Sequence, residues 1–241
     1  NIDTAVGGLR LNILPYIIMF FYCIFIAAAY AGVFNRKFSE SLAPAFFIHI
    51  FVIFVGAVFF HHVTWGIAAG IVFALLLIVL KCIRAKSISQ ALRDLAGQFN
   101  DTGFIIFIVF YAFIAISNIG KHFMDWDEFN HWGIFLKETL RIDDLYCVSP
   151  KNIGHKDYVP AITLFEALWC RMSLRFEEAD AYRAIQMLQF SMILPMIRDR
   201  ENGVVVRNKR INVYSIMTDF FKAVFVLALP LLFSGQTFYH T

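Results

Sequence analysis

The chain has 241 residues, of which 59% are hydrophobic and 16% are charged, and it contains 28 phenylalanines. An average globular domain carries about 25% charged residues, so this chain has too few polar side chains to cover a water-soluble core of its size. The formal net charge is only +3, and the basic residues lie in short loops, which argues against a nucleic-acid partner. The composition therefore predicts an integral membrane protein in contact with membrane lipids.

Four apolar runs in the first half of the chain predict transmembrane helices, because a helix needs about 20 mostly apolar residues to cross a bilayer. They cover residues 11–33, 42–60, 63–80 and 104–119, and together they form an N-terminal transmembrane region over residues 1–119. His61 and His62 make the turn between the second and third runs. His49 lies inside the second run, where we expect it to hydrogen-bond to a neighbouring helix.

Charged residues become frequent between residues 120 and 182, although tryptophan and phenylalanine are interleaved with them. We expect this segment to be a large external loop that contains amphipathic helices. Two further transmembrane helices are predicted after it, over residues 183–197 and 212–233. The expected fold class is therefore all-α, a polytopic transmembrane protein with interfacial helices in the loop. Because the chain starts at Asn1 and stops just after an apolar run, we expect both ends to be cut.

Lysine and arginine gather in three loops, and this distribution predicts the orientation of the chain through the positive-inside rule. The loops at 34–41, 81–103 and 198–212 carry two, four and five basic residues. All three fall on the same side of the predicted spans, so we assign them to the cytoplasm. The 120–182 loop then faces the outside of the cytoplasmic (plasma) membrane.

The segment directly after the fourth apolar run concentrates the side chains that can do chemistry. Asp125, Asp127 and Glu128 place three carboxylates within four residues, and His131 follows one helical turn after Asp127. Carboxylates and histidine are the usual general bases of enzymes, so these four side chains are the candidate catalytic residues. The three carboxylates are also candidate ligands for Mg²⁺ or Mn²⁺, which prefer oxygen ligands. The alternative is that acids and tryptophans only mark a membrane interface.

The same segment has the pattern of an amphipathic helix. If the chain is helical from Asp127 onward, one face carries an apolar stripe made of Phe129, Trp132, Leu136 and Leu140. Such a stripe predicts a helix that lies in the membrane interface, with tryptophan at the depth of the lipid headgroups.

A second cluster of polar residues runs from Lys151 to Pro160 and precedes a run rich in leucine and phenylalanine. Pro160 suits the first turn of a helix. His155 and Lys156 would then stand beside helix N-terminal N–H groups, where a phosphate can bind. The alternative is an exposed polar loop before an interfacial helix.

Two motifs in this order resemble those of bacterial polytopic glycosyltransferases of the GT-C class. The first is the acidic, aromatic string from Asp125 to Trp132, and the second runs from Lys156 to Ala161. The second string departs from the commoner Tyr-Pro-Pro-Gly form at Val159 and Ala161. The resemblance covers roughly residues 104–175. It implies an enzyme that takes a sugar from a polyprenyl-phosphate-linked donor and transfers it to a glycan, lipid or protein acceptor on the outer face of the membrane.

The resemblance also implies a role for each candidate residue. Asp127 or Asp125 would take the proton of the acceptor hydroxyl, and Glu128 or the other aspartate would orient the acceptor or bind a divalent cation. His131 would hydrogen-bond the base or the phosphate. The donor phosphate would be bound by a set of cationic and phenolic side chains, in which the cations neutralise the charge of the leaving group: Lys137, Arg141, Lys156 and Tyr158.

Two other functions stay open at the level of the sequence, a membrane transporter and a non-catalytic membrane subunit of a larger assembly. An intramembrane histidine such as His49 would be a functional candidate in a transporter. Transporters, however, usually break their helices with glycine or proline at mid-membrane, whereas the polar residues here gather in one loop.

Overall fold

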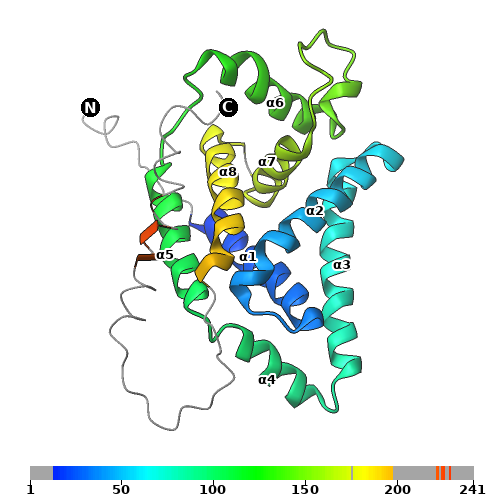
Figure 1. Ribbon diagram of the computed structural model, residues 1–241. Helices are drawn as coiled ribbons and strands as arrows, with labels where there is room; N and C mark the ends of the chain where they lie inside the picture. The colour runs from blue at the N-terminus through cyan, green and yellow to red at the C-terminus, as the bar shows by residue number, and fades with distance from the viewer. Residues whose placement is uncertain (1–12, 175, 198–220, 223, 226–227, 229–241) are drawn as a thin grey trace, which may run out of the picture.

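The structure is a computed structural model that describes residues 13–174, 176–197, 221–222, 224–225 and 228 (Figure 1). The regular elements of these residues are all helical, which confirms the predicted all-α class. In chain order the elements are α1 (Leu14–Phe34), α2 (Phe38–Phe60), α3 (Val63–Arg84), α4 (Ile88–Gln98), α5 (Thr102–Ser117), the π-helix η1 (Glu128–Trp132), α6 (Gly133–Ile142), the 3-10 helix η2 (Tyr146–Val148), α7 (Ala161–Met172), α8 (Glu178–Ile193) and the 3-10 helix η3 (Leu194–Ile197).

Three of the described helices, α1, α2 and α3, are long and apolar enough to cross a membrane. They overlap the runs predicted at 11–33, 42–60 and 63–80. Helix α5 has only 16 residues, which is short of the roughly 20 that a bilayer requires. Together α4 and α5 meet the same requirement, although they are bent by 66° at the break between them, so the described residues contain three candidate spans or up to four.

The two spans predicted after the loop have different outcomes. Residues 183–197 lie within α8 and η3, which are not among the candidate spans of the described residues. Helix α8 begins with charged residues and packs against α7, α5 and α2. The run predicted at 212–233 lies outside the described residues, apart from residues 221–222, 224–225 and 228.

Helices α2 and α3 make the most extensive contact, because glycines let their backbones touch. A Cβ atom on Gly56 would lie 2.6 Å from the Cα of Gly66, and one on Gly66 would lie 2.7 Å from the Cα of Ile53. Small residues at a helix crossing are typical of membrane helices, whose association depends on close packing. His49 of α2 hydrogen-bonds to the hydroxyl of Tyr22 in α1, which confirms the predicted contact between helices.

Helix α4 interrupts the segment that the sequence assigned to a cytoplasmic loop. The hydroxyl of Ser87 caps its N-terminus by accepting a hydrogen bond from the N–H of Gln90 at 3.2 Å. Ala91 is fully buried, whereas Ile88 and Leu92 are 71% and 60% exposed. Figure 1 shows α4 running along one end of the bundle, from the end of α3 to the start of α5.

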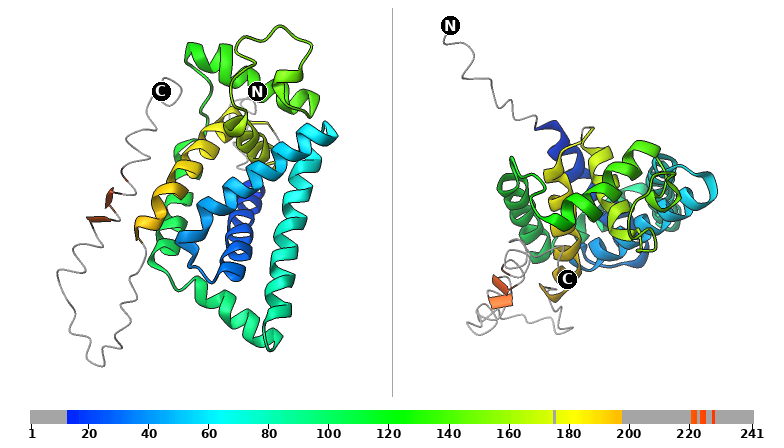
Figure 2. Two further views of the ribbon diagram at one scale, coloured as in Figure 1. Left: turned by 45° about the vertical axis from the view of Figure 1, so that its right-hand side comes forward. Right: turned by 90° about the horizontal axis from the view of Figure 1, so that it is seen from above.

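The chain from 120 to 160 gathers at the opposite end of the bundle, as Figure 1 and the left view of Figure 2 show. A histidine–aspartate clasp fixes it to the α2–α3 turn. His61 Nδ1 lies 3.0 Å from a carboxylate oxygen of Asp144, and His62 Nδ1 lies 3.3 Å from one of Asp143. The N–H of Val63 also donates to the carbonyl of Asp143 at 2.7 Å. The loop is therefore fixed to the α2–α3 turn and the start of α3.

Candidate functional site

The acidic segment enters the site through a π-helical turn. The N–H of Gly133 bonds to the carbonyl of Glu128, five residues back, and such turns occur frequently at functional sites. A Cβ atom on Gly133 would lie 2.3 Å from that carbonyl oxygen and 2.7 Å from the ring of Phe123. Glycine is therefore required at this position for the wide turn to form.

The π turn also breaks the apolar stripe that the sequence suggested. Leu136 is fully buried, whereas Phe129 is 52% exposed. An i→i+5 turn holds one residue more than an α turn, so side chains before it are rotated relative to those after it. The prediction of a single stripe through Phe129, Trp132, Leu136 and Leu140 is wrong for this reason.

Glu128 is a buried carboxylate that organises the backbone around it. One oxygen accepts hydrogen bonds from the N–H groups of Met124 at 2.7 Å and Asp125 at 3.1 Å. The other accepts from the hydroxyl of Tyr182 in α8 at 2.6 Å. Burial, followed by this contact with Glu128, raises the pKa of Tyr182 well above its usual value. Glu128 thus fixes the acidic segment to α8.

Asp127 and His131 form a pair at the surface of the same turn, with 3.5 Å between a carboxylate oxygen and Nδ1. Both side chains are partly exposed, at 31% and 25%. The ring of His131 meets that of His155 with 4.5 Å between centroids, and His155 stacks on Tyr158 at 4.8 Å. Trp132 approaches Tyr158 at 5.8 Å. We call these five residues the histidine cluster.

The histidine cluster unites the two sequence motifs. Asp127, His131 and Trp132 come from the first motif, and Tyr158 belongs to the second, with His155 just before it. The hydroxyl of Tyr146 holds the second motif in place by donating to the carbonyl of Tyr158 at 2.7 Å. Tyr146 in turn stacks on Phe135 of α6 with ring centroids 4.1 Å apart. The packing of α6 therefore positions a segment some twenty residues further along the chain.

Two of the predicted phosphate-binding cations, Lys137 and Arg141, are paired with acids. Lys137 Nζ lies 2.6 Å from Glu178, whose other oxygen accepts from the N–H of Phe123 at 3.0 Å. Burial would raise the pKa of Glu178, but the bonds from Lys137 and Phe123 outweigh it and lower the pKa overall. The Nε of Arg141 donates to Glu138 of the same helix at 2.8 Å.

Glu138 is a buried acid that neither motif contains. Its oxygens accept bonds from Arg141 at 2.8 Å, from Lys151 at 2.8 Å and from the hydroxyl of Ser149. The bond from Arg141 lowers the pKa of Glu138 far below its usual value against the opposing effect of burial, and those from Lys151 and Ser149 add to it. The Glu138 carboxylate thus joins α6 to the chain that leads into the second motif.

Lys156 is placed differently from the other cations. Its Nζ donates to the carbonyl of Ser149 at 2.5 Å, a contact that folds the loop without neutralising the charge. An ammonium group carries three N–H donors, so Lys156 keeps the capacity to bind an anion. Pro160 is the N-cap residue of α7, one position before the first turn in which the sequence placed it.

The structure does not assemble the three carboxylates into a metal centre. Among the described residues, no group of three or more His, Cys, Asp and Glu side chains is arranged to hold a metal ion. Both oxygens of Glu128 instead face N–H and O–H donors, which a cation would not favour. The residues present therefore do not fit the Mg²⁺ or Mn²⁺ that the sequence suggested.

Sequence reasoning missed Glu138 and Glu178, although both organise the site. Arg141 follows Glu138 by three residues, so helical spacing could have revealed that pair. The pairing of Glu138 with Lys151 and of Glu178 with Lys137 joins residues far apart in the sequence, and no local pattern reveals it.

Comparison of the chain with protein-family models, with curated proteins and with solved structures finds no match.

Proposed function

We propose that this protein is a membrane glycosyltransferase that uses a sugar carried on a polyprenyl phosphate. The observation that carries the proposal is the histidine cluster, in which an acid–histidine pair from one motif meets residues of the other. Such a meeting brings a candidate base, aromatic faces for a sugar and a nearby lysine to one place. Sugar transfer from a lipid phosphate uses a base for the acceptor hydroxyl and a positive charge for the leaving phosphate.

The reaction assigned to the cluster is a displacement at the anomeric carbon. The acceptor hydroxyl oxygen forms a bond to that carbon while the bond from the carbon to the phosphate oxygen breaks. Asp127 takes the hydroxyl proton, and the lipid phosphate leaves with the bonding electron pair. His131, 3.5 Å from Asp127, orients the carboxylate, and Asp125 is the second acid beside the acceptor.

The leaving phosphate is assigned to Lys156 and Tyr158. Lys137 and Arg141 are engaged by Glu178 and Glu138, so the proposal gives them the task of shaping the loop. A positive charge fixed near the phosphate lowers the barrier as negative charge develops on the leaving group. Trp132 offers its ring face to the sugar beside Tyr158.

The surroundings of the cluster suit a donor with a long apolar tail. Met124 and Trp126 flank Asp125 and are 82% and 76% exposed. Large exposed apolar side chains next to polar ones are typical of a surface that contacts lipid. The segment also follows α5 after a short connection, and Ile116 in the last turn of α5 is exposed.

The proposal is tested by replacing Asp127 with Asn in the protein as expressed in membranes. Transfer of radiolabelled sugar from lipid-linked donors to acceptor material is measured, together with the amount of protein in the membrane fraction. We expect normal insertion and a loss of transfer of about 100-fold or more, the usual contribution of a general base. Asp157→Asn is the matched control, because it makes the same change at an exposed acid of the same loop that has no assigned task.

Two outcomes would contradict the assignment. Full transfer activity in Asp127→Asn would show that Asp127 is not the base. An equal loss of transfer in the Asp157→Asn control would show that the loop responds only to charge. Uptake of a labelled solute into vesicles, without any transfer, would favour a transporter instead. Unchanged biological function of Asp127→Asn without either activity would favour a non-catalytic subunit.

A further inference from the structure

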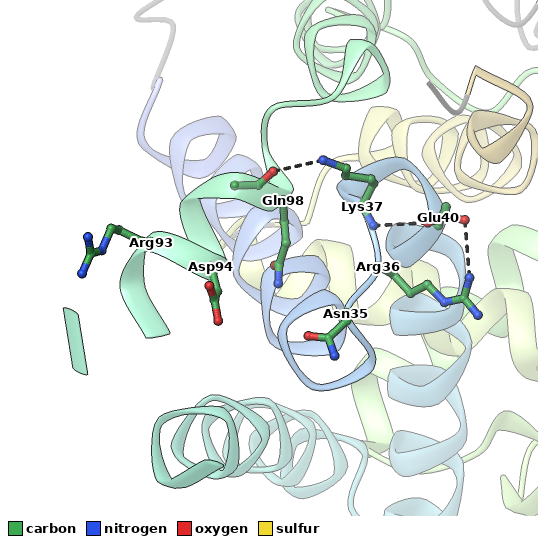
Figure 3. A pocket seen from close by; sticks show the side chains of 8 residues that line it. Asn35, Arg36, Lys37, Glu40, Arg93, Asp94 and Gln98 are labelled. Carbon is green, nitrogen blue, oxygen red and sulfur yellow. Dashed lines mark hydrogen bonds and ion pairs between the residues drawn. The ribbon is translucent and has the colours of Figure 1, made fainter. Parts of the chain in front are cut away.

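A polar cavity of about 500 Å³ lies at the end of the bundle formed by α4, remote from the histidine cluster. Its lining comes from the α1–α2 connection, the first turn of α2 and α4, and is shown in Figure 3. The lining residues are Asn35, Arg36, Lys37, Glu40, Arg93, Asp94, Gly97 and Gln98. We call it the α4 cavity.

The inner part of the α4 cavity is rich in hydrogen-bond acceptors. Gln98 is 7% exposed, and its Oε1 has no hydrogen-bond partner in the described part of the chain. Figure 3 shows its side chain reaching from α4 toward Asn35, near Asp94. Lys81 binds Asp94 at 3.1 Å and the Asn35 amide oxygen at 3.3 Å, but it leaves the Gln98 oxygen unmatched. A buried acceptor without a donor is costly, so a ligand with N–H groups fits this position.

Cationic side chains stand on the α2 side of the cavity. Arg36 is 54% exposed and lies 3.7 Å from Glu40, a weak pair at the surface. Lys37 Nζ donates to the carbonyl of Gly97 at 3.4 Å, and this contact holds the ammonium group at the cavity wall. Arg93 points away from the other lining residues (Figure 3). The cavity therefore offers acceptors inside and positive charge beside them.

The position of the cavity suits a membrane surface. Helix α3 has 22 residues and so spans about 33 Å, close to the roughly 30 Å of a bilayer core. The histidine–aspartate clasp lies at its start and α4 lies at its end (Figure 1). Apolar side chains next to lining residues in the chain are exposed, among them Phe34 at 52% and Leu92 at 60%, and so is Ile83 in the last turn of α3, at 74%. Acyl chains can lie along these side chains while a headgroup enters the cavity.

We propose that the α4 cavity binds the headgroup of a phosphatidylethanolamine lipid. The primary ammonium donates hydrogen bonds to Gln98 Oε1 and to Asp94, and the phosphate lies against Lys37 and Arg36. The trimethylammonium of phosphatidylcholine has no N–H group and cannot satisfy Gln98. A headgroup that carries only negative charge would meet the carboxylates of Asp94 and Glu40.

The proposal is tested by native mass spectrometry of the protein in detergent, titrated with short-chain phosphatidylethanolamine or phosphatidylcholine. We expect the ethanolamine lipid to bind about tenfold more tightly, as one hydrogen bond to a charged group implies. Gln98→Leu should remove that preference, whereas Gln98→Glu, which keeps an acceptor, should retain it. Gln90→Leu is the matched control, because it makes the same change at an exposed position of the same helix and should retain the preference.

Several results would overturn the proposal. The headgroup would not be bound as proposed if the two lipids bound equally to the wild-type protein. The same conclusion would follow if Gln98→Leu kept the preference for the ethanolamine lipid. Loss of the preference in Gln90→Leu would point to a general effect of α4 on lipid binding. Soluble phosphoethanolamine is added as a competitor, and displacement of the lipid at equal concentration would make a soluble ester the ligand instead.

Discussion

Helices α1, α2 and α3 meet through glycines and apolar side chains, whereas the segment from Phe123 to Tyr158 is joined by carboxylates that bridge separate pieces of backbone. In the first region Gly56 and Gly66 bring two helices into backbone contact. In the second, Glu128 and Glu138 accept three or more hydrogen bonds each from surrounding backbone and side-chain donors.

The difference follows from what each region has available. A long apolar helix has its backbone hydrogen bonds satisfied within itself, so only shape distinguishes one packing from another. A short polar segment must satisfy N–H groups and charges through its side chains, because an unpaired buried group costs about 1–3 kcal/mol. Steric changes should therefore damage the first region most, and changes of charge the second.

The largest effect is expected where the helices touch. Gly66→Ala places a Cβ atom 2.7 Å from the Cα of Ile53, so α2 and α3 must separate at a cost of about 2–3 kcal/mol. Thermal unfolding in detergent should show a lower midpoint. Gly154→Ala is the control, since a Cβ atom there meets nothing within 4 Å. Equal midpoints for Gly66→Ala and the wild-type protein would show that the contact does not hold the helices together.

An intermediate effect is expected at the buried acid of the loop. Glu138→Gln keeps the shape of the side chain but weakens its bonds to Arg141 and Lys151, which are half exposed, for a loss of about 1–2 kcal/mol. The folded pKa of Glu138 is lowered, so its contribution is complete above the unfolded value of about 4.3 and fades as the pH falls toward the folded value. The two proteins should therefore differ in unfolding free energy at about pH 7 and converge as the pH falls below about 4. A difference in unfolding free energy that grows as the pH falls would contradict the lowered pKa of Glu138.

The smallest effect is expected at the pair of Lys137 and Glu178. Lys137 is 48% exposed, although Glu178 is only 18% exposed, and ion pairs with a solvent-exposed partner contribute about 1 kcal/mol or less. Lys137→Gln should shift the unfolding midpoint only slightly, and added salt should reduce the shift further. A shift as large as that of Glu138→Gln would place Lys137 among the buried determinants of the loop.

Much of the helical framework could be predicted from the sequence. The apolar runs at 11–33, 42–60 and 63–80 contain the information for α1, α2 and α3, because hydrophobic length alone defines such helices. Helix α4 escapes this criterion because its apolar face is short and polar residues surround it. The run at 183–197 is apolar enough to suggest a span, but it lies in α8 and η3, which are not among the candidate spans of the described residues.

The candidate site was predictable in its residues but not in its connections. Asp127 and His131 could be paired from the sequence, because four residues make one helical turn. That Glu128 turns inward to Tyr182, while Asp127 stays at the surface, depends on the π turn. The hydrophobic periodicity of the sequence does not reveal such a turn, because the turn adds a single residue to the helical repeat. The partners of Lys137 and Lys151 likewise depend on loop closure.

Because of the π turn, the function of the acidic motif depends on the number of residues in it as well as on their types. The extra residue between Asp127 and Gly133 rotates everything before it by about 100° relative to α6. The side chain of Phe129 is half exposed. We therefore expect substitution of Phe129 to be tolerated and deletion of the residue not to be. Deleting Phe129 would rotate Asp127 by about 100° relative to His131 and the second motif, even with every acid retained.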